Sequence, residues 1–286
     1  MVTNLPTKKI RTPAKLNIRL KVTGRRPDGY HEVVSIMVPI NLCDHLELEK
    51  VCLGGITLAC RGLYLPNDES NLVYRAATAF FSMTGIRPGL HISLTKRIPV
   101  AAGLGGGSSN AGCTLKALND MWQNPLTSRD LADLAVRLGA DVPFFLECRP
   151  CIATGIGEIL EPIEKWPKFW YVIVTPTFGV ATSWVYSNLK IELTTAEHDS
   201  IIKNLEKASL DVADILENDL ETVTGSHFPA INTIKDSLMD AGAQGALMSG
   251  SGPSVFGVFR SKNQAVSAKR QLMAKNMGDV FAVEGL

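Results

Sequence analysis

The sequence lacks any apolar run that approaches the roughly 18 consecutive residues needed to cross a bilayer. It also lacks an excess of charge of either sign, because 29 Lys and Arg face 28 Asp and Glu and leave a net charge of +1. This balance disfavours a nucleic-acid partner. The basic amino-terminal segment has no apolar core of a secretory signal. We expect a cytoplasmic bacterial protein that binds neither membrane nor nucleic acid, with a plastid location as an alternative.

The sequence is also poor in cysteine, with six in 286 residues. They are scattered through a chain too long to need disulfide staples, so we expect reduced thiols. Cys148 and Cys151 form one C-x-x-C, but no second pair or histidine pair follows to complete a structural zinc site. The apolar fraction of 45% is typical of a soluble globular protein, and the length suffices for two domains.

Apolar periodicity and turn residues predict a chain of mixed strands and helices. Because the two types do not alternate strictly, the pattern favours an α+β architecture. The segment KWPKFW, residues 165–170, is the best candidate for a domain boundary. Strands are expected at 14–22, 33–41, 44–50, 56–61, 91–98, 142–147, 152–160, 171–176 and 280–284, and residues 249–259 are expected to form a second glycine loop that leads into a strand. Helices are expected at 68–83, 110–122, 127–138, 181–188, 197–207, 209–216, 228–241 and 263–275.

The most informative segment is PVAAGLGGGSSNA, residues 99–111, which lies between an expected strand and an expected helix. Glycines at 103, 105, 106 and 107 allow backbone N–H groups to converge without obstruction by side chains. The helix that follows adds the positive end of its dipole. The segment therefore predicts a phosphate site. The alternative is a plain connecting turn, which rarely needs so many glycines.

Three well-known phosphate loops do not fit this spacing. No lysine follows the glycines, as a P-loop requires, because Gly107 leads into Ser108. The third glycine of a dinucleotide fingerprint is replaced by Ser108. The H-R-D and D-F-G tripeptides of protein kinases are absent from the sequence. The loop is therefore a phosphate cradle of another kind.

Three segments together resemble the motifs of the GHMP small-molecule kinases: PAKLN at 13–17, PVAAGLGGGSS at 99–109 and MSGSGPSVFG at 248–257. Within that family the chain is similar to one branch, because RRPDGYHE at 25–32, the lengthened glycine loop and LGADVPFF at 138–145 match it. The shorter G-L-G-S-S-A loop of mevalonate and homoserine kinases is not present.

The resemblance implies ATP-dependent phosphorylation of the 2-hydroxyl of a methylerythritol linked to cytidine diphosphate, in the non-mevalonate route to isoprenoids. It implies a two-domain α+β GHMP kinase fold with the active site in the cleft between the domains. The amino-terminal domain, 1–165, would be ribosomal-protein-S5-like and bind ATP; the carboxyl-terminal domain, 166–286, would be α/β-plait-like. Mg²⁺ is expected with ATP. We expect a monomer or a weak homodimer.

The resemblance also assigns roles to individual residues. Asp141 would be the general base and Lys15 would stabilise charge on the deprotonated hydroxyl and the phosphoryl group. From the local sequence alone, a turn or cap carboxylate is the favoured interpretation of Asp141, and the resemblance reverses that preference. The alternative for Lys15 is an outward-facing strand lysine. ATP-binding residues would be Asn71, Lys96, Pro99, Val100, Ala101, Ala102, Gly103, Leu104, Gly105, Gly106, Gly107, Ser108 and Ser109, with Ser109 also a candidate magnesium ligand.

Substrate-binding residues implied by the resemblance are Asn17, Tyr30, His31, Thr182, Tyr186, Gly250, Ser251 and Gly252. Tyr30, His31 and Tyr186 would hold the cytosine by stacking and hydrogen bonds. The competing interpretations are structural: Asn71 and Thr182 as helix caps, Asn17 as a strand-edge amide and Tyr186 as a core residue. Two other functions stay open at this point. One is a GHMP kinase for mevalonate, homoserine or a sugar, and the other is a catalytically inactive nucleotide-binding regulator.

Overall fold

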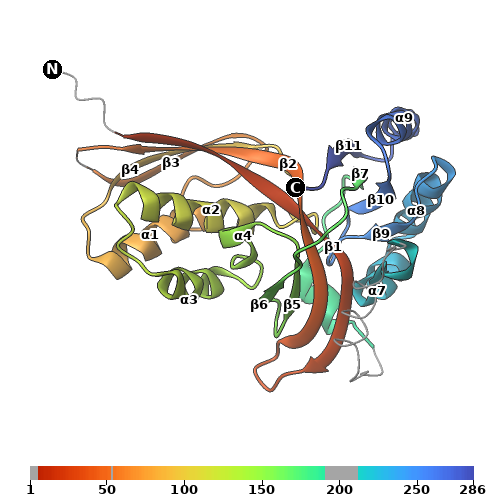
Figure 1. The fold of residues 1–286 in the computed structure, drawn as a ribbon, viewed down its shortest axis with the longest axis horizontal. Coiled ribbons are helices and arrows are strands. Elements are labelled where there is room, and N and C mark those ends of the chain that lie inside the picture. The colour runs from red at the N-terminus through yellow and green to blue at the C-terminus, as the bar shows by residue number, and fades with distance from the viewer. Residues whose placement is uncertain (1–5, 53, 191–211) are drawn as a thin grey trace. The chain divides into compact units, whose positions relative to one another are not determined.

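The computed structural model describes residues 6–52, 54–190 and 212–286, which pack into two compact units (Figure 1). Unit 1 comprises residues 1–14, 42–100 and 105–148, and unit 2 comprises 15–41, 101–104 and 149–286. The strands β1 (Thr7–Arg25) and β2 (His31–Lys50) contribute residues to both units. The domain boundary expected after residue 165 lies inside unit 2, so the two packed units do not coincide with the two expected domains.

The sheet of unit 1 is built on β3 (Gly55–Gly62) and β4 (Gly89–Lys96), which run parallel. On its other side β4 pairs antiparallel with the second half of β2, from His45 to Lys50. Every second residue of β4 is buried, which is the alternation that predicted this strand. The two strands predicted at 33–41 and 44–50 are one continuous strand, β2.

Four helices complete unit 1: α1 (Leu72–Thr84), α2 (Gly106–Met121), α3 (Ser128–Leu138) and α4 (Phe144–Glu147). The first three gather on one side of β3 and β4 (Figure 1) and bury a core that includes Phe80, Leu94 and Leu115. The α3 helix forms where the sequence predicts a helix, and it begins at a capping box between Thr127 and Asp130.

Two expectations in unit 1 are wrong. The α2 helix begins at Gly106 rather than Asn110, so residues 106–109 of the glycine loop form its first turn. Residues 144–147 form a short helix rather than a strand. Pro143 explains the second difference, because its φ of −55° already fits a helix and its ring is suited to a helix start.

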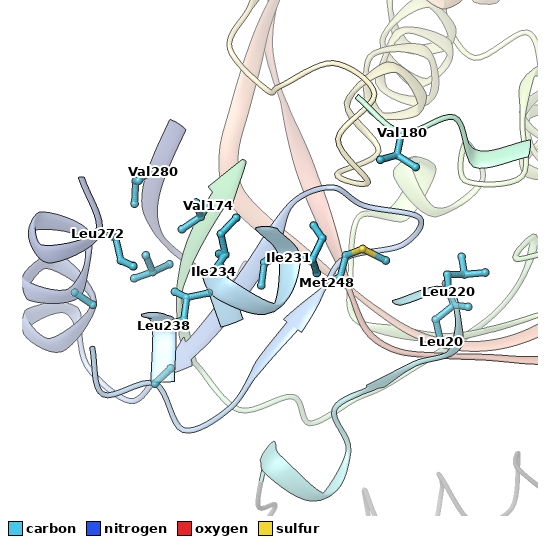
Figure 2. Packing of buried hydrophobic residues seen from close by; sticks show 14 of the residues in the cluster. Leu20, Val174, Val180, Leu220, Ile231, Ile234, Leu238, Met248, Leu272 and Val280 are labelled. Atoms are coloured by element: carbon cyan, nitrogen blue, oxygen red, sulfur yellow. The ribbon is translucent and has the colours of Figure 1, made fainter. Parts of the chain in front are cut away.

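Unit 2 contains an antiparallel sheet in the order β11 (Asp279–Glu284), β7 (Trp170–Thr175), β10 (Val255–Phe259) and β9 (Ala246–Met248). Its helices are α5 (Thr182–Ser187), α7 (Asp219–His227), α8 (Ala230–Asp240) and α9 (Lys262–Met273). The helices α8 and α9 lie on one side of the sheet strands (Figure 1). Val174 of β7 and Leu238 of α8 belong to the core of the unit, part of which Figure 2 shows.

The remaining strands of unit 2 pair with the long strands. A hairpin of β5 (Cys151–Thr154) and β6 (Ile159–Pro162) pairs antiparallel with β2, and β8 (Glu217–Asn218) pairs parallel with β1 at Arg19 and Leu20. The mixture of pairings agrees with the predicted α+β class. No helix of the described part of the chain is long and apolar enough to span a membrane.

The sequence predicts β5, β6, β7, β10, β11, α5, α8 and α9 but not β8, β9 or α7. The helix predicted at 197–207 lies outside the described residues. Only the end of the helix predicted at 209–216 is described, and it contains a 3₁₀ turn, η1 (Val212–Asp214).

Candidate active site

The predicted site residues fall into two groups, one in each unit. Unit 1 holds the start of the glycine loop, the helix after it, the expected adenine region and the proposed base: Asn71, Lys96, Pro99, Val100, Gly105, Gly106, Gly107, Ser108, Ser109 and Asp141. Unit 2 holds the remaining residues: Lys15, Asn17, Tyr30, His31, Ala101, Ala102, Gly103, Leu104, Thr182, Tyr186, Gly250, Ser251 and Gly252.

The glycine loop of unit 1 ends in the open amino terminus of α2. Gly105 is the N-cap, in the left-handed region at φ 67°, and provides no side chain to cap the helix. The first hydrogen bond of the helix runs from the Ser109 N–H to the Gly105 carbonyl oxygen at 2.8 Å. The N–H groups of residues 106–108 precede that bond and lie at the positive end of the helix dipole. This arrangement suits the oxygens of a phosphate.

Gly106 is required by its packing. A Cβ atom there would lie 2.6 Å from the Lys96 Nζ and 2.9 Å from the Ile98 Cγ2. At Gly107 the nearest atom to an added Cβ would be the Leu72 Cδ1, at 3.3 Å. The loop therefore needs glycine at 106 for space, whereas glycine at 107 leaves the backbone accessible from outside.

A buried carboxylate, Asp44, supports the loop from behind. Its Oδ1 accepts hydrogen bonds from the backbone N–H groups of Arg97, at 2.6 Å, and Ile98, at 2.8 Å. Its Oδ2 accepts from the Asn110 Nδ2 at 3.0 Å and pairs with the Lys96 ammonium. Asp44 thus joins the residues that follow β4 to the second turn of α2.

Lys96 is buried together with its partner, since its side chain is 2% exposed and that of Asp44 is 0% exposed. Burial lowers the pKa of Lys96, and the charge and hydrogen bond of Asp44 oppose that shift. The ammonium therefore lies behind the cradle, against Gly106. A direct contact between Lys96 and a nucleotide stays a prediction.

Asn71, predicted in the adenine region, is the N-cap of α1. Its Oδ1 accepts from the Val73 N–H at 3.0 Å, and its Nδ2 donates to the Pro66 carbonyl oxygen at 2.9 Å. The structural interpretation of Asn71 as a cap is therefore confirmed. Asp141 lies half-buried in the turn between α3 and α4, after the C-cap Gly139.

Among the described residues, no group of three or more His, Cys, Asp or Glu could hold a metal ion. The Ser109 side chain, the candidate magnesium ligand, is fully buried, and its hydroxyl has no hydrogen-bond partner among the described residues. Mg²⁺ prefers oxygen ligands and keeps several waters, and Ser109 as one of its ligands stays a prediction.

In unit 2, Lys15 and Asn17 of β1 lie against the second glycine loop. The buried Lys15 ammonium donates to the Asn17 Oδ1, and the Asn17 Nδ2 donates to the Ser35 Oγ at 2.8 Å. A Cβ atom at Gly250, which has φ 57°, would lie 3.1 Å from the Asn17 Oδ1 and 3.5 Å from the Lys15 Nζ. Lys15 is therefore a buried, oriented cation rather than an outward-facing strand lysine.

Ser249 connects all three sequence motifs inside unit 2. Its hydroxyl donates to the Gly103 carbonyl oxygen at 3.0 Å and accepts from the Asn17 N–H at 3.3 Å. Gly103, at φ 76°, must be glycine because a Cβ atom would collide with the Ser249 carbonyl oxygen. The Lys15 N–H also donates to the Leu104 carbonyl oxygen at 3.0 Å.

The aromatic candidates of unit 2 include one direct contact. The rings of His31 and Tyr186 are stacked, with centroids 5.0 Å apart and an interplanar angle of 27°. Tyr30 is 58% exposed. Burial, and to a lesser degree the charge of Arg25, lowers the pKa of His31 from its ordinary value, which favours the neutral ring.

Thr182 is the first residue of α5, whose N-cap is Ala181. Its hydroxyl forms a 2.9 Å hydrogen bond with the Ser251 hydroxyl instead of capping the helix. The alternative interpretation of Thr182 as an N-cap is therefore wrong.

The sequence interpretation missed four residues that hold the loops: Asp44, Asn218, Thr224 and Ser249. Only Ser249 carried a signal, since it lies within the third motif. Asp44 is hidden in an apolar strand, and its partners Lys96 and Asn110 are 52 and 66 residues away.

Comparison with known proteins places this geometry in a class. The chain matches the GHMP kinases N terminal domain over residues 71–148 and the GHMP kinases C terminal domain over 199–279. It therefore belongs to the GHMP kinases. Among these, it belongs to the family of the 4-diphosphocytidyl-2-C-methyl-D-erythritol kinases.

A 4-diphosphocytidyl-2-C-methyl-D-erythritol kinase of Syntrophotalea carbinolica is 47% identical to the chain, over 95% of this chain and 96% of the relative. A crystal structure of a 4-(cytidine 5'-diphospho)-2C-methyl-D-erythritol kinase superposes with a TM-score of 0.83 at 36% identity, covering 97% of this chain and 99% of the other. A homoserine kinase from Cytophaga hutchinsonii, at 21% identity and a TM-score of 0.76 over 99% and 95% of the two chains, shares the fold alone.

The two glycines at the start of α2 should respond differently to alanine. Gly106→Ala should lower the free energy of unfolding by about 1–3 kcal/mol, because the new methyl group must displace Lys96 or Ile98. Gly107→Ala is the matched control, and its effect should lie between no change and a gain of about 1 kcal/mol from helix propensity. Urea unfolding of the free protein measures both. Equal effects of the two substitutions would contradict the packing described here.

The buried pair behind the loop should be sensitive to loss of one partner. Asp44→Asn leaves the Lys96 ammonium buried without its counter-charge, so the free energy of unfolding should fall by about 3–5 kcal/mol. The double variant Asp44→Asn/Lys96→Met removes the stranded charge and should recover most of that loss. Chemical denaturation compares the two. A single variant within about 1 kcal/mol of the parent would refute a supporting role for the pair.

Proposed function

We propose that the chain transfers the γ-phosphoryl group of ATP to the 2-hydroxyl of 4-diphosphocytidyl-2-C-methyl-D-erythritol, giving the 2-phosphate and ADP in the methylerythritol phosphate route to isopentenyl diphosphate. The observation that carries this proposal is the joining of all three GHMP motifs through Ser249, with the Lys15 ammonium against Gly250. The relatives that match nearly the whole chain support the choice of substrate, because they bear the name of this kinase.

The glycine loop is proposed to hold the phosphates of ATP. The uncapped N–H groups at the start of α2 can donate to phosphate oxygens, and the helix dipole favours their negative charge. Asp44 and Lys96 form a neutral pair behind the loop, so their role is to hold its backbone in place. Asn71 is proposed to combine its capping of α1 with lining the adenine pocket.

The hydroxyl that would accept the phosphoryl group is a poor nucleophile. Carbon 2 of a 2-C-methyl polyol carries no hydrogen, so its hydroxyl is a hindered tertiary alcohol that is a poor acid. Asp141 is proposed to accept the proton of this hydroxyl as the oxygen attacks the γ-phosphorus. Lys15, a buried ammonium held by Asn17, is proposed to stabilise the developing negative charge. Gly250, Ser251 and Thr182 are proposed to orient the substrate beside Lys15.

The cytidine end of the substrate is proposed to bind at the aromatic residues of unit 2. Tyr30 is exposed and can provide a ring face, while Tyr186 and His31 already stack on each other. A cytosine ring can stack on these residues, and a neutral His31 can accept a hydrogen bond from the cytosine amino group. This feature distinguishes the proposed substrate from mevalonate, homoserine or a sugar, none of which carries a base.

Magnesium is proposed to enter with ATP, whose β- and γ-phosphate oxygens it would bridge and neutralise. The described residues contain no group of three or more His, Cys, Asp or Glu for the ion, and the Ser109 hydroxyl is proposed as its protein ligand.

An assay of ADP release with a panel of acceptors tests the proposed function. Release is expected with the cytidylated methylerythritol and not with mevalonate or homoserine. Asp141→Asn and Lys15→Met should each lower kcat at least about 100-fold, because each removes a group that acts on the transition state, while KM for ATP changes little. Activity on mevalonate alone would overturn the substrate assignment, and normal turnover in either variant would remove that residue from the mechanism.

The pH dependence of substrate binding tests the role of His31. Its pKa is lowered from the ordinary histidine value, so KM for the cytidylated substrate should change little between about pH 7 and 8. Below that range the ring gains a proton and loses its acceptor lone pair, so KM should rise as the pH falls, with KM for ATP as the internal control. His31→Gln should abolish the rise. A KM that already climbs between pH 8 and 7 would show that the ring is not held neutral.

A further inference from the structure

The first side chain of α7's amino-terminal end that contacts the second glycine loop, residues 249–252, is that of Asn218. Asn218 is buried and is the N-cap of α7, where its Oδ1 accepts from the Leu220 N–H at 3.0 Å. Both of its Nδ2 hydrogen bonds lead to the loop region, to the carbonyl oxygens of Met248 and Gly250, each at 2.8 Å. The amide thus caps a helix with its oxygen and holds the loop with its nitrogen.

A second residue of α7 reaches the same loop. The buried Thr224 hydroxyl donates to the Ser251 carbonyl oxygen at 3.2 Å. Together, Asn218 and Thr224 bind the carbonyl groups of residues 248, 250 and 251. The loop needs this support, because Gly250 and Gly252 adopt φ of 57° and 80° and glycine restricts its own backbone very little.

We infer that Asn218 and Thr224 are positioning residues for phosphoryl transfer: they hold the second glycine loop so that Gly250 stays against Lys15 and Asn17. They act through the loop rather than on the substrate. The inference rests on the proposed function for its catalytic consequence, but the contacts it describes lie entirely within unit 2. Small displacements of groups that orient a reacting centre lower rates strongly.

Two substitutions separate holding the loop from capping the helix. Asn218→Ser keeps a side-chain oxygen that can cap α7 but removes both donors to the loop. Thr224→Val removes one hydroxyl at nearly constant volume. The matched control is Thr222→Val on the same helix, since the exposed Thr222 hydroxyl donates only to the Asp219 carbonyl oxygen, at 2.7 Å.

Kinetics provide the first readout. Asn218→Ser should lower kcat at least about tenfold while KM for ATP stays within about twofold. Thr224→Val should change kcat in the same direction by a smaller factor, and Thr222→Val should leave it within about twofold of the parent. Equal kcat values in the three variants would overturn the inference.

Amide hydrogen exchange of the free protein provides a second readout that needs no activity. Peptides covering residues 246–256 should exchange about tenfold faster in Asn218→Ser, whereas peptides of α7 should exchange as in the parent. Faster exchange of α7 as well as the loop would show that Asn218 only stabilises the helix, and unchanged exchange of the loop would also refute the inference. If the parent protein releases no ADP with the cytidylated substrate, the proposed function fails while hydrogen exchange still decides whether Asn218 holds the loop.

Discussion

The hydrogen bonds accepted by the buried carboxylate of Asp44 are the constraint on which the glycine loop of unit 1 depends. One carboxylate binds two backbone N–H groups, the Lys96 ammonium and the Asn110 amide, so the segment after β4 and the start of α2 cannot move independently. In unit 2, the side-chain amide of Asn218 restrains the second glycine loop, because it caps α7 with its oxygen and donates to two carbonyl groups with its nitrogen. Bare glycine backbone serves phosphate chemistry only when buried side chains restrict its freedom.

Much of the fold follows from local patterns in the sequence. The alternation in β4 and the capping box at Thr127 and Asp130 are complete within a few residues, and both elements form where predicted. The errors occur where local and tertiary preferences differ. The start of α2 was missed because Gly106 and Gly107 are poor helix formers that only the packing of the loop makes helical. The α7 helix, DLETVTGSH, combines threonines and a glycine with weak apolar periodicity, so its sequence gives little sign of a helix.

The candidate site shows the same limit. Lys15, Gly103 and Gly250 could be predicted because each lies in a motif, and the motifs resemble those of a known family of kinases. The residues that hold these three in place could not be predicted from the sequence. Asp44 and Asn218 contact loops far away in the sequence, and a buried polar residue in an apolar segment has no local signature of its partners. Steric demands at Gly103 and Gly106 are likewise visible only in the folded chain.

The central claim is transfer of phosphate to a tertiary hydroxyl, and phosphorus NMR of the product tests it most directly. The chain is incubated with ATP, magnesium and 4-diphosphocytidyl-2-C-methyl-D-erythritol, and the proton-coupled spectrum of the new phosphomonoester is recorded. Because carbon 2 carries no hydrogen, a phosphate on its oxygen should give a resonance without three-bond coupling to a proton, with the diphosphate resonances of the substrate intact. A monoester split by protons on its own carbon, which places the phosphate on another hydroxyl, or the absence of any new monoester would contradict the account.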